Sequence, residues 1–313
     1  MANEITNANL TPDLRLAAMI TQEIALFLKD TQNLRNSQFL RYYGSINGLG
    51  SNVVRVRRAA LDGYDSFEEP GEIATPATPN TTLTDAHVDI TVARQYLGYA
   101  ISDMASITAF GPNDIDPFRL AESIAASYET RFSQLQSTTA SALSSNVVGN
   151  ATDQFSVDLF FEAIFALEQA ASNVGASGPF AMVLHPKQLV ELQDSLRNET
   201  SNAVSMMQAT QEMLRAKGQG FAGTLFGCEL YRSSHVTNAG GAHQGYMITP
   251  NCLGYADGVP VNLPRAVDFM QMGKVTVELA RDGQNALTNI MGHAYLGISI
   301  IDEDRGCLVK SIQ

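Results

Sequence analysis

Apolar side chains recur at helical spacing in several segments of the chain, and each such pattern predicts an amphipathic helix. The longest predicted helix opens at Asp116-Pro117, where proline suits the first turn, and runs to about Ser144. At about 1.5 Å per residue it spans roughly 40 Å, longer than most globular helices. Shorter helices are expected over 11–30, 156–171, 187–197 and a segment that ends at Gly218.

The long predicted helix has two different faces. Its apolar face carries Ala121, Ile124, Tyr128, Phe132 and Leu135. The opposite face carries Glu122, Glu129 and Gln136. We expect the apolar face to pack against the rest of the protein.

Alternating apolar and polar residues predict strands on both sides of an unusual segment. Val54 and Val56 alternate with Arg55 and Arg57, so 52–57 is expected to be a strand with one apolar and one basic face. A second strand is expected over 88–99, where the alternation is less strict.

The segment Asp62–Asp85 between these strands holds six acids and three prolines but neither lysine nor arginine. Loops longer than about 12–15 residues are uncommon in compact domains. We therefore expect this segment to be extended and supported from outside its own domain.

Strands dominate the later part of the chain. A short buried strand is expected at 181–184, and further strands at 224–232, 245–249, 274–280 and 294–301. The last of these is expected to turn through Asp302–Gly306 into 307–312, giving a terminal hairpin. Helices and antiparallel strands are mixed, so the predicted class is α+β.

Charge and composition exclude several functions. The formal net charge is −12, whereas a dedicated nucleic-acid binder has a basic face. The three cysteines, Cys228, Cys252 and Cys307, lie far apart and are expected to be buried small apolar side chains. Neither a signal peptide nor an apolar run long enough for a membrane span is found in the sequence.

The sequence contains partial matches to catalytic and cofactor motifs, but each lacks a feature that the function requires. Residues 218–223 match G-x-G-x-x-G, but the order of helix and strand is the reverse of a dinucleotide site, so a helix C-cap and a turn are expected. The stretch 302–306 lacks the later ligands of a calcium loop. The five histidines lack metal-ligand spacing, and we expect each on the surface or in a turn. We therefore predict no enzyme activity, no metal and no cofactor.

The order of these elements resembles the Hong Kong-97-type major capsid proteins of tailed double-stranded DNA bacteriophages. The similar passages include ITVARQYLGYAISDMA, MVLHPKQLVELQDSL, GTLFGCELYRSSHV and YLGISIIDEDRGCLV. That resemblance implies an α+β capsid fold with an N-terminal arm, an extended β-hairpin loop, a long spine helix, a peripheral domain and an axial domain.

The resemblance also implies a division of the chain. The arm would cover 1–47, the extended loop 48–102, and the peripheral domain with its spine helix 103–145. The axial domain would cover 146–272, and closing strands of the peripheral domain 273–313.

The function implied by the resemblance is structural. The chain would self-assemble through pentamers and hexamers into an icosahedral shell, built in the host bacterial cytoplasm, that becomes the capsid of the virion and encloses DNA without reading its sequence. Expected partners are further copies of the chain, a separate scaffolding protein, a portal protein and a possible decoration protein, but no membrane. The alternatives are an encapsulin-type nanocompartment and a soluble enzyme with an unrecognised site.

Charge suggests how the loop would be held in such a shell. The loop acids would contact arginines of a neighbouring copy, since the loop has no base of its own. The candidate inter-subunit residues are Arg55, Arg57, Arg58, Asp62, Asp65, Glu68, Glu69, Glu72, Arg119 and Arg131. The simpler interpretation is a solvated acidic loop.

Overall fold

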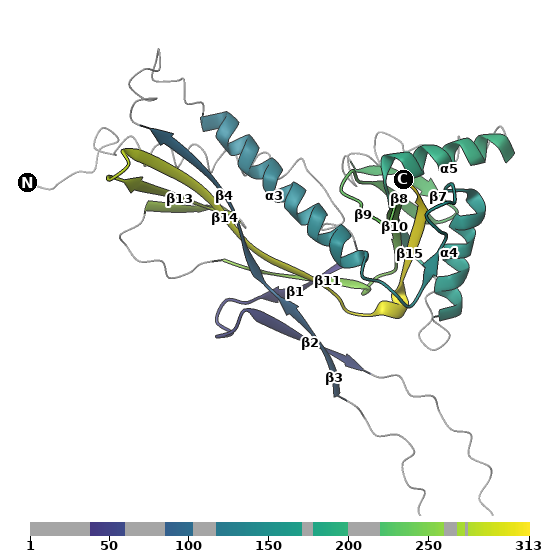
Figure 1. Cartoon of the computed structure of the whole chain (residues 1–313). Helices are drawn as coiled ribbons and strands as arrows, with labels where there is room; N and C mark the ends of the chain where they lie inside the picture. Colours follow the sequence, from purple (N-terminus) through teal and green to yellow (C-terminus); the bar gives the residue numbers. More distant parts are fainter. Residues whose placement is uncertain are drawn as a thin grey trace, which may run out of the picture.

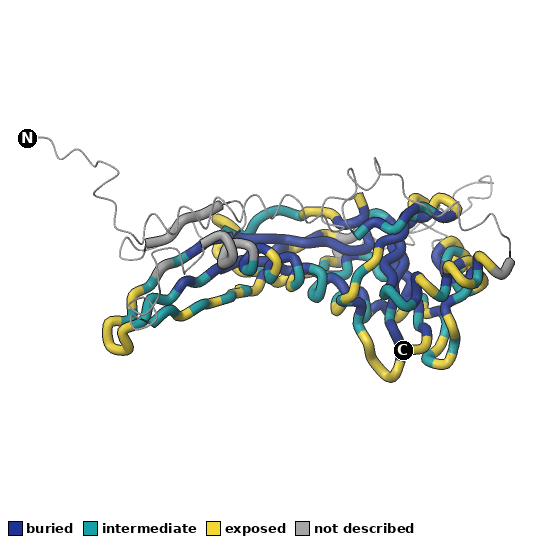
Figure 2. The backbone as a smooth tube through the Cα atoms, turned by 90° about the horizontal axis from the view of Figure 1, so that it is seen from above, coloured by how far each residue is buried: buried dark blue, intermediate teal, exposed yellow. Residues whose placement is uncertain are grey.

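The computed structural model describes residues 38–59, 85–102, 117–170, 178–199, 220–259, 268–272 and 275–313. Within these ranges the chain forms two large sheets, a two-stranded hairpin and long helices packed on the sheets, so the predicted α+β class is confirmed (Figure 1). The molecule is elongated, and its buried residues run through the middle (Figure 2).

The first sheet is built around one long strand, β14 (Leu287–Ile300). On one edge β14 pairs with β4 (Ala93–Ser102). On the other edge it pairs with β13 (Val275–Asp282) and then β11 (Leu253–Gly258). The sheet ends in β12 (Asp268–Met272), next to β13, and β1 (Leu40–Ser45), parallel to β11.

The long helix α3 (Pro117–Ala140) lies along this sheet (Figure 1). Ile124, Tyr128 and Phe132 are buried in the same core cluster as Ile290 and Ala294 of β14, which confirms the predicted apolar face.

The opposite face of α3 is not uniformly solvated. Glu129 and Gln136 are 5% and 3% exposed. Near its end the helix meets the second sheet, where Tyr246 lies against Gln136 and Ser137. Helical periodicity describes one packed face, and this helix is covered on more than one side.

The second sheet has the order β5-β15-β10-β6-β8-β7, with β9 beside β10. The bounds of its strands are β5 (Val147–Val148), β15 (Gly306–Ile312), β10 (Ala242–Ile248), β6 (Phe180–Leu184), β8 (Cys228–Arg232), β7 (Phe221–Leu225) and β9 (Asn238–Ala239).

Two helices pack on the second sheet, α4 (Val157–Ala170) and α5 (Pro186–Glu199). The backbone N–H of Leu159 donates to the hydroxyl of Ser156, which caps α4. Both helices bury their apolar faces, among them Phe160 and Leu192, in one cluster with the strands. All three cysteines are buried, as expected.

The expected terminal hairpin is wrong. β14 belongs to the first sheet, whereas β15 pairs with β10 and β5 of the second. Between them the short 3-10 helix η2 (Glu303–Arg305) redirects the chain, held by an ion pair between Arg305 Nε and Asp302 Oδ2 at 3.1 Å. Apolar and polar residues alternate normally in both strands. Their placement in different sheets therefore arises from tertiary pairing. The division into domains at 146 and 273 stays a prediction.

The hairpin consists of β2 (Val53–Ala59) and β3 (Asp85–Thr91) and projects from the body (Figure 1). We call these two strands the stem. The single strand expected over 88–99 is divided between β3 and β4, because Val92 turns its N–H to the carbonyl of Asn52 at 2.8 Å. Gly297 of β14 permits this crossing, since a Cβ there would overlap the Thr91 carbonyl oxygen.

Candidate functional site

The stem has an apolar face that anchors it to the body. Val54 and Val56 of β2 and Ile90 of β3 are buried in one cluster with Ala256 and Ile301. The predicted alternation along β2 is therefore confirmed. Because this small core sets the stem's direction, the polar face of the stem is held in a defined place.

On the polar face, Arg55 and Asp89 form a two-point ion pair across the strands. Arg55 Nε donates to Asp89 Oδ1 at 2.9 Å, and Nη2 donates to Oδ2 at 3.2 Å. The hydrogen bond from Arg55 lowers the pKa of the Asp89 carboxyl, against a smaller opposing effect of burial. Arg55, expected to reach a neighbouring copy, thus has a carboxylate partner in its own chain.

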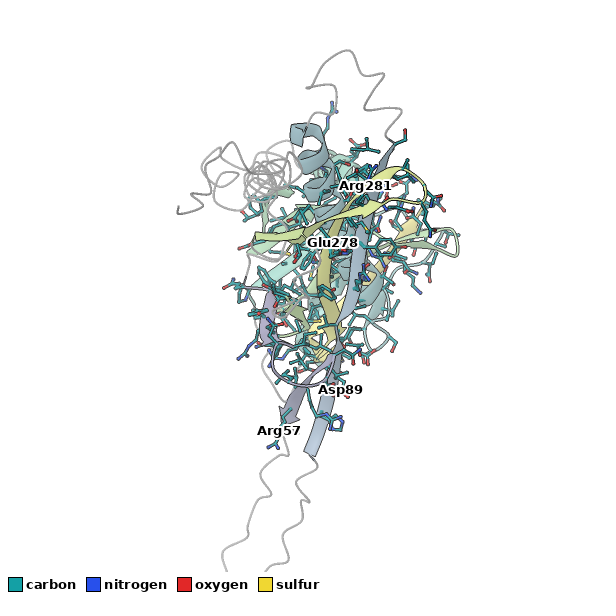
Figure 3. The ribbon with its side chains drawn as sticks, turned by 90° about the vertical axis from the view of Figure 1, so that its left-hand side faces the viewer. Arg57, Asp89, Glu278 and Arg281 are labelled. Atoms are coloured by element: carbon teal, nitrogen blue, oxygen red, sulfur yellow. The ribbon has the colours of Figure 1, made fainter. Side chains whose placement is uncertain are left out.

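Arg57 differs from Arg55 although both lie on the exposed face of β2. Its cross-strand neighbour is His87, not an acid. Within the described ranges, the Arg57 side chain makes no hydrogen bond or ion pair. Figure 3 shows it where the stem leaves the body, at the end opposite to Glu278 and Arg281.

A groove lies between α3 and the first sheet, with a volume of about 310 Å³. Its apolar lining includes Leu97, Tyr128 and Val275, and its polar lining includes Gln95 and Arg131. Arg131 is exposed on α3, and its Nε donates to Gln95 Oε1 of β4 at 2.8 Å. Arg131 thus places an exposed cationic group at the groove.

The remaining predicted contact residues, or their side chains, lie outside the described part of the chain. Asp62, Asp65, Glu68, Glu69 and Glu72 lie outside the described residues. Arg58 and Arg119 belong to β2 and α3, but the description does not extend to their side chains. The contacts expected between loop acids and arginines stay a prediction.

Sequence reasoning missed a polar connection through His293. His293 Nε2 lies 2.8 Å from Glu278 Oε2, and its Nδ1 lies 3.1 Å from Arg94 Nη2. The tautomer that satisfies both contacts carries its proton on Nε2. These side chains tie together β4, β14 and β13.

The expectation of surface histidines is wrong for two of the five. His293 and His243 are 5% and 4% exposed. Both sit inside apolar strand sequences, MGHAYLG and GAHQGYMI, and that context was the available signal.

Among the described residues, three or more histidine, cysteine or acidic side chains do not come together in a way that could hold a metal ion. In the same ranges, every helix is too short or too polar to cross a bilayer.

Comparisons with known proteins give fold matches but no sequence matches. No protein-family model and no curated protein matches the sequence. Among solved structures, the capsid of Myoviridae phage XM1 matches with a TM-score of 0.60 and 13% identity, covering 90% of this chain and 92% of that one.

Two further structures match over similar shares of the chain. The capsid of Ralstonia phage GP4 has a TM-score of 0.58 and 12% identity over 90% of this chain and 91% of its own. An encapsulin complex from Synechococcus elongatus has a TM-score of 0.55 and 13% identity over 86% of this chain and 84% of its own. The chain therefore shares one fold with phage capsid and encapsulin subunits.

Proposed function

We propose that this chain, which has the fold of phage capsid subunits, is the major capsid protein of a tailed bacteriophage. Many copies would assemble through pentamers and hexamers into an icosahedral shell around double-stranded DNA. The observation that carries the proposal is the match to two phage capsids over about nine-tenths of both chains. The stem adds support, because its apolar face is buried on the body while it projects outward.

The proposed shell also assigns roles to the parts of the fold. The first sheet with α3 would be the peripheral domain, and α3 its spine helix. The second sheet with α4 and α5 would be the axial domain, and β2 and β3 the base of the extended loop. Since β11 and β12 pair in the first sheet and β15 in the second, the chain would cross between the two domains more often than the linear division implies.

We infer that the acidic loop of one copy docks on arginines of the next. Arg57 supports this, because it is exposed and its cross-strand neighbour is a histidine. The groove at Arg131 offers a second landing place for an extended acidic segment. Arg58 and Arg119 remain further candidates. Exposed ion pairs contribute about 0–1 kcal/mol each, so repetition around a shell would set register more than stability.

The partners and location follow from the same proposal. A separate scaffolding protein and a portal protein would take part in assembly in the host cytoplasm, and a decoration protein could bind the finished shell. The chain would enclose DNA without reading its sequence, consistent with the net charge of −12. Catalysis and a cofactor have no part in this function.

An encapsulin-type nanocompartment is the second candidate, favoured by the match to the Synechococcus complex. In an encapsulin the predicted helix over 11–30 would hold a cargo peptide, whereas in a phage shell it would lie under neighbouring subunits. That segment lies outside the described residues.

Negative-stain microscopy with analytical ultracentrifugation tests the proposal. The purified full chain is expected to form closed shells or capsomer rings, with interfaces in the obligate range above about 2,000 Å². A compact monomer at every concentration would contradict both shell functions. Particles that retain protein cargo through a short peptide, and do not package DNA, would favour the encapsulin.

A further inference from the structure

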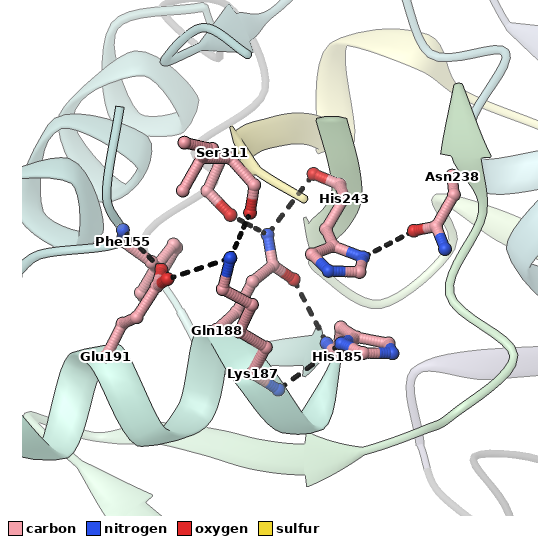
Figure 4. A network of polar contacts seen from close by, with 9 residues as sticks. Phe155, His185, Lys187, Gln188, Glu191, Asn238, His243 and Ser311 are labelled. Carbon is pink, nitrogen blue, oxygen red and sulfur yellow. Dashed lines mark hydrogen bonds and ion pairs between the residues drawn. The ribbon is translucent and has the colours of Figure 1, made fainter. Parts of the chain in front are cut away.

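Two histidines of the second sheet lie face to face, although 57 intervening residues separate them in the sequence. His185 precedes the first residue of α5, and His243 belongs to β10. Their rings are stacked with centroids 3.9 Å apart and planes 12° apart (Figure 4). The nitrogen lone pairs lie in the plane of each ring, so those of two parallel rings do not point at a common metal ion.

Each ring has a defined hydrogen-bonding role. His185 Nδ1 accepts the backbone N–H of Lys187 at 3.3 Å and thereby caps the first turn of α5. This bond requires an unprotonated Nδ1. His243 Nδ1 donates to Oδ1 of Asn238 on β9, so its proton sits on Nδ1. The His185 ring is therefore neutral in this arrangement, and the bond to Asn238 leaves Nε2 as the nitrogen of His243 at which a proton would be gained.

The surroundings oppose a positive charge on either ring. Burial lowers the pKa of His185, followed by the effects of His243 and Lys187. Burial also lowers the pKa of His243, with a contribution from Lys187 and an opposing one from Glu191. The positive end of the α5 dipole acts in the same direction. The neighbouring strands contribute the neutral side chains of Asn238 on β9 and Ser311 on β15. Ser311 lies opposite His243 in the register of the two strands.

The pair adjoins the contacts that hold α5 to the sheet. Gln188, which is fully buried, donates to the His243 carbonyl at 3.3 Å and to the Ser311 hydroxyl at 2.9 Å. Its Oε1 accepts the N–H of His185 at 3.0 Å. A Cβ at Gly245 would come within 2.8 Å of this oxygen, so the strand is shaped to the glutamine. The start of α5 is thus joined to β10 and β15 at one point.

We propose that the stacked His185–His243 pair is an acid-sensitive latch that holds the N-terminus of α5 on β10 and β15. A proton on His185 Nδ1 would point at the Lys187 N–H and remove the cap. A proton on His243 Nε2 would place a buried cation against the other ring. The inference concerns the second sheet alone and stands whether or not the chain forms a shell.

The direction of the pH effect follows from linkage. Both folded-state pKa values lie below the ordinary value of 6.5, so the latch contributes its full stability above about pH 6.5. That stability is lost as the pH falls from 6.5 through the lowered values. Each unit by which a histidine pKa is lowered corresponds to about a tenfold change in the population of the open latch at low pH.

Exchange measurements on the full-length protein test the latch. Histidine Cε1 hydrogen exchange, read by mass spectrometry between pH 4 and 8, is expected to show both rings titrating below 6.5. Amide exchange, corrected for its intrinsic pH dependence, is expected to rise in 187–192 and 242–248 as the pH falls from 7.5 to 4, about tenfold for each unit by which the histidine pKa is lowered. Peptides from 287–300 in the first sheet should not follow that rise.

His185→Asn separates the cap from the titration. Asparagine can still accept the Lys187 N–H but does not ionise, so the acid-induced rise at the start of α5 should be clearly smaller than in wild type, with the remainder due to His243. His235→Gln is the matched control in the same part of the fold and should behave as wild type. Normal titration of both wild-type rings, wild-type protection that stays unchanged after both rings have taken up a proton, or an equal rise in His185→Asn would each overturn the latch. If His185→Asn does not fold, the wild-type titration decides alone.

Discussion

Arg55 and Asp89 face each other across the stem, and both oxygens of the Asp89 carboxylate are bound by the one guanidinium. Arg55 therefore has a carboxylate partner within its own chain. Arg57, two residues further along the same face, is opposite His87 instead. Two arginines that are equivalent in the sequence pattern therefore have different roles in the structure.

Asp89→Asn should loosen the stem at neutral pH. Because the pair lowers the Asp89 pKa below 3.8, its contribution is present above that value and is lost as the pH falls through the lowered one. Amide exchange in 53–58 and 86–91 should therefore rise severalfold in the variant at pH 7, and the difference from wild type should shrink as the pH falls below 3.8.

Two comparisons control this prediction. Adding Arg55→Ala to Asp89→Asn should have little further effect, since the two residues share one interaction. Asp194→Asn, at an exposed acid of α5, should leave the stem unchanged. A variant Asp89→Asn with wild-type exchange at pH 7 would show that the pair does not hold the stem.

Gly297→Ala should disturb the crossing of β14 and the β3–β4 junction. The added methyl would overlap the Thr91 carbonyl, so backbone must move, and overpacking of this kind costs about 1–3 kcal/mol. Gly283→Ala is the matched control, because nothing lies within 4 Å of a Cβ there. Thermal unfolding should show a clear loss for Gly297→Ala and a change within about 0.5 kcal/mol for the control. Equal melting of the two variants would refute the close approach.

Arg57→Glu should impair assembly if acidic loops dock on neighbouring stems. The defect should be clearest at low salt, where charge interactions are least screened, and light scattering would measure it. Glu69→Lys in the same chain should partly restore assembly by exchanging the two signs. Arg232→Glu, at an exposed arginine at the end of β8, should have no such effect. If Arg57→Glu assembles as well as wild type at low salt, the docking proposal is wrong, whereas the shell proposal stands.

The shell should not be linked covalently through a lysine of the extended loop. No lysine occurs between Lys29 and Lys187, so the loop has no amine to form an isopeptide bond. Mature particles boiled in detergent should therefore run as single subunits in electrophoresis. A ladder of multimers that survives reductant would contradict this.

The local pattern of apolar and polar residues was sufficient to predict which face of a strand or helix is buried. The alternation of Val54 and Val56 with two arginines defined a strand with one buried face, and the buried face of α3 followed from Ile124, Tyr128 and Phe132. These predictions succeeded because side-chain periodicity directly reports which face of an element avoids water. The order of such elements was enough to indicate the fold.

Tertiary structure alone decided which elements meet. β14 and β15 look like the two halves of a hairpin, yet they belong to different sheets, because alternation does not encode the partner of a strand. His185 and His243 could not be paired from the sequence, since their stacking depends on α5 docking against β10. Arg55 and Arg57 share one pattern, but only the register of β3 gives one of them an aspartate and the other a histidine. Local propensity acts over a few residues, whereas pairing and burial depend on contacts between residues far apart in the chain.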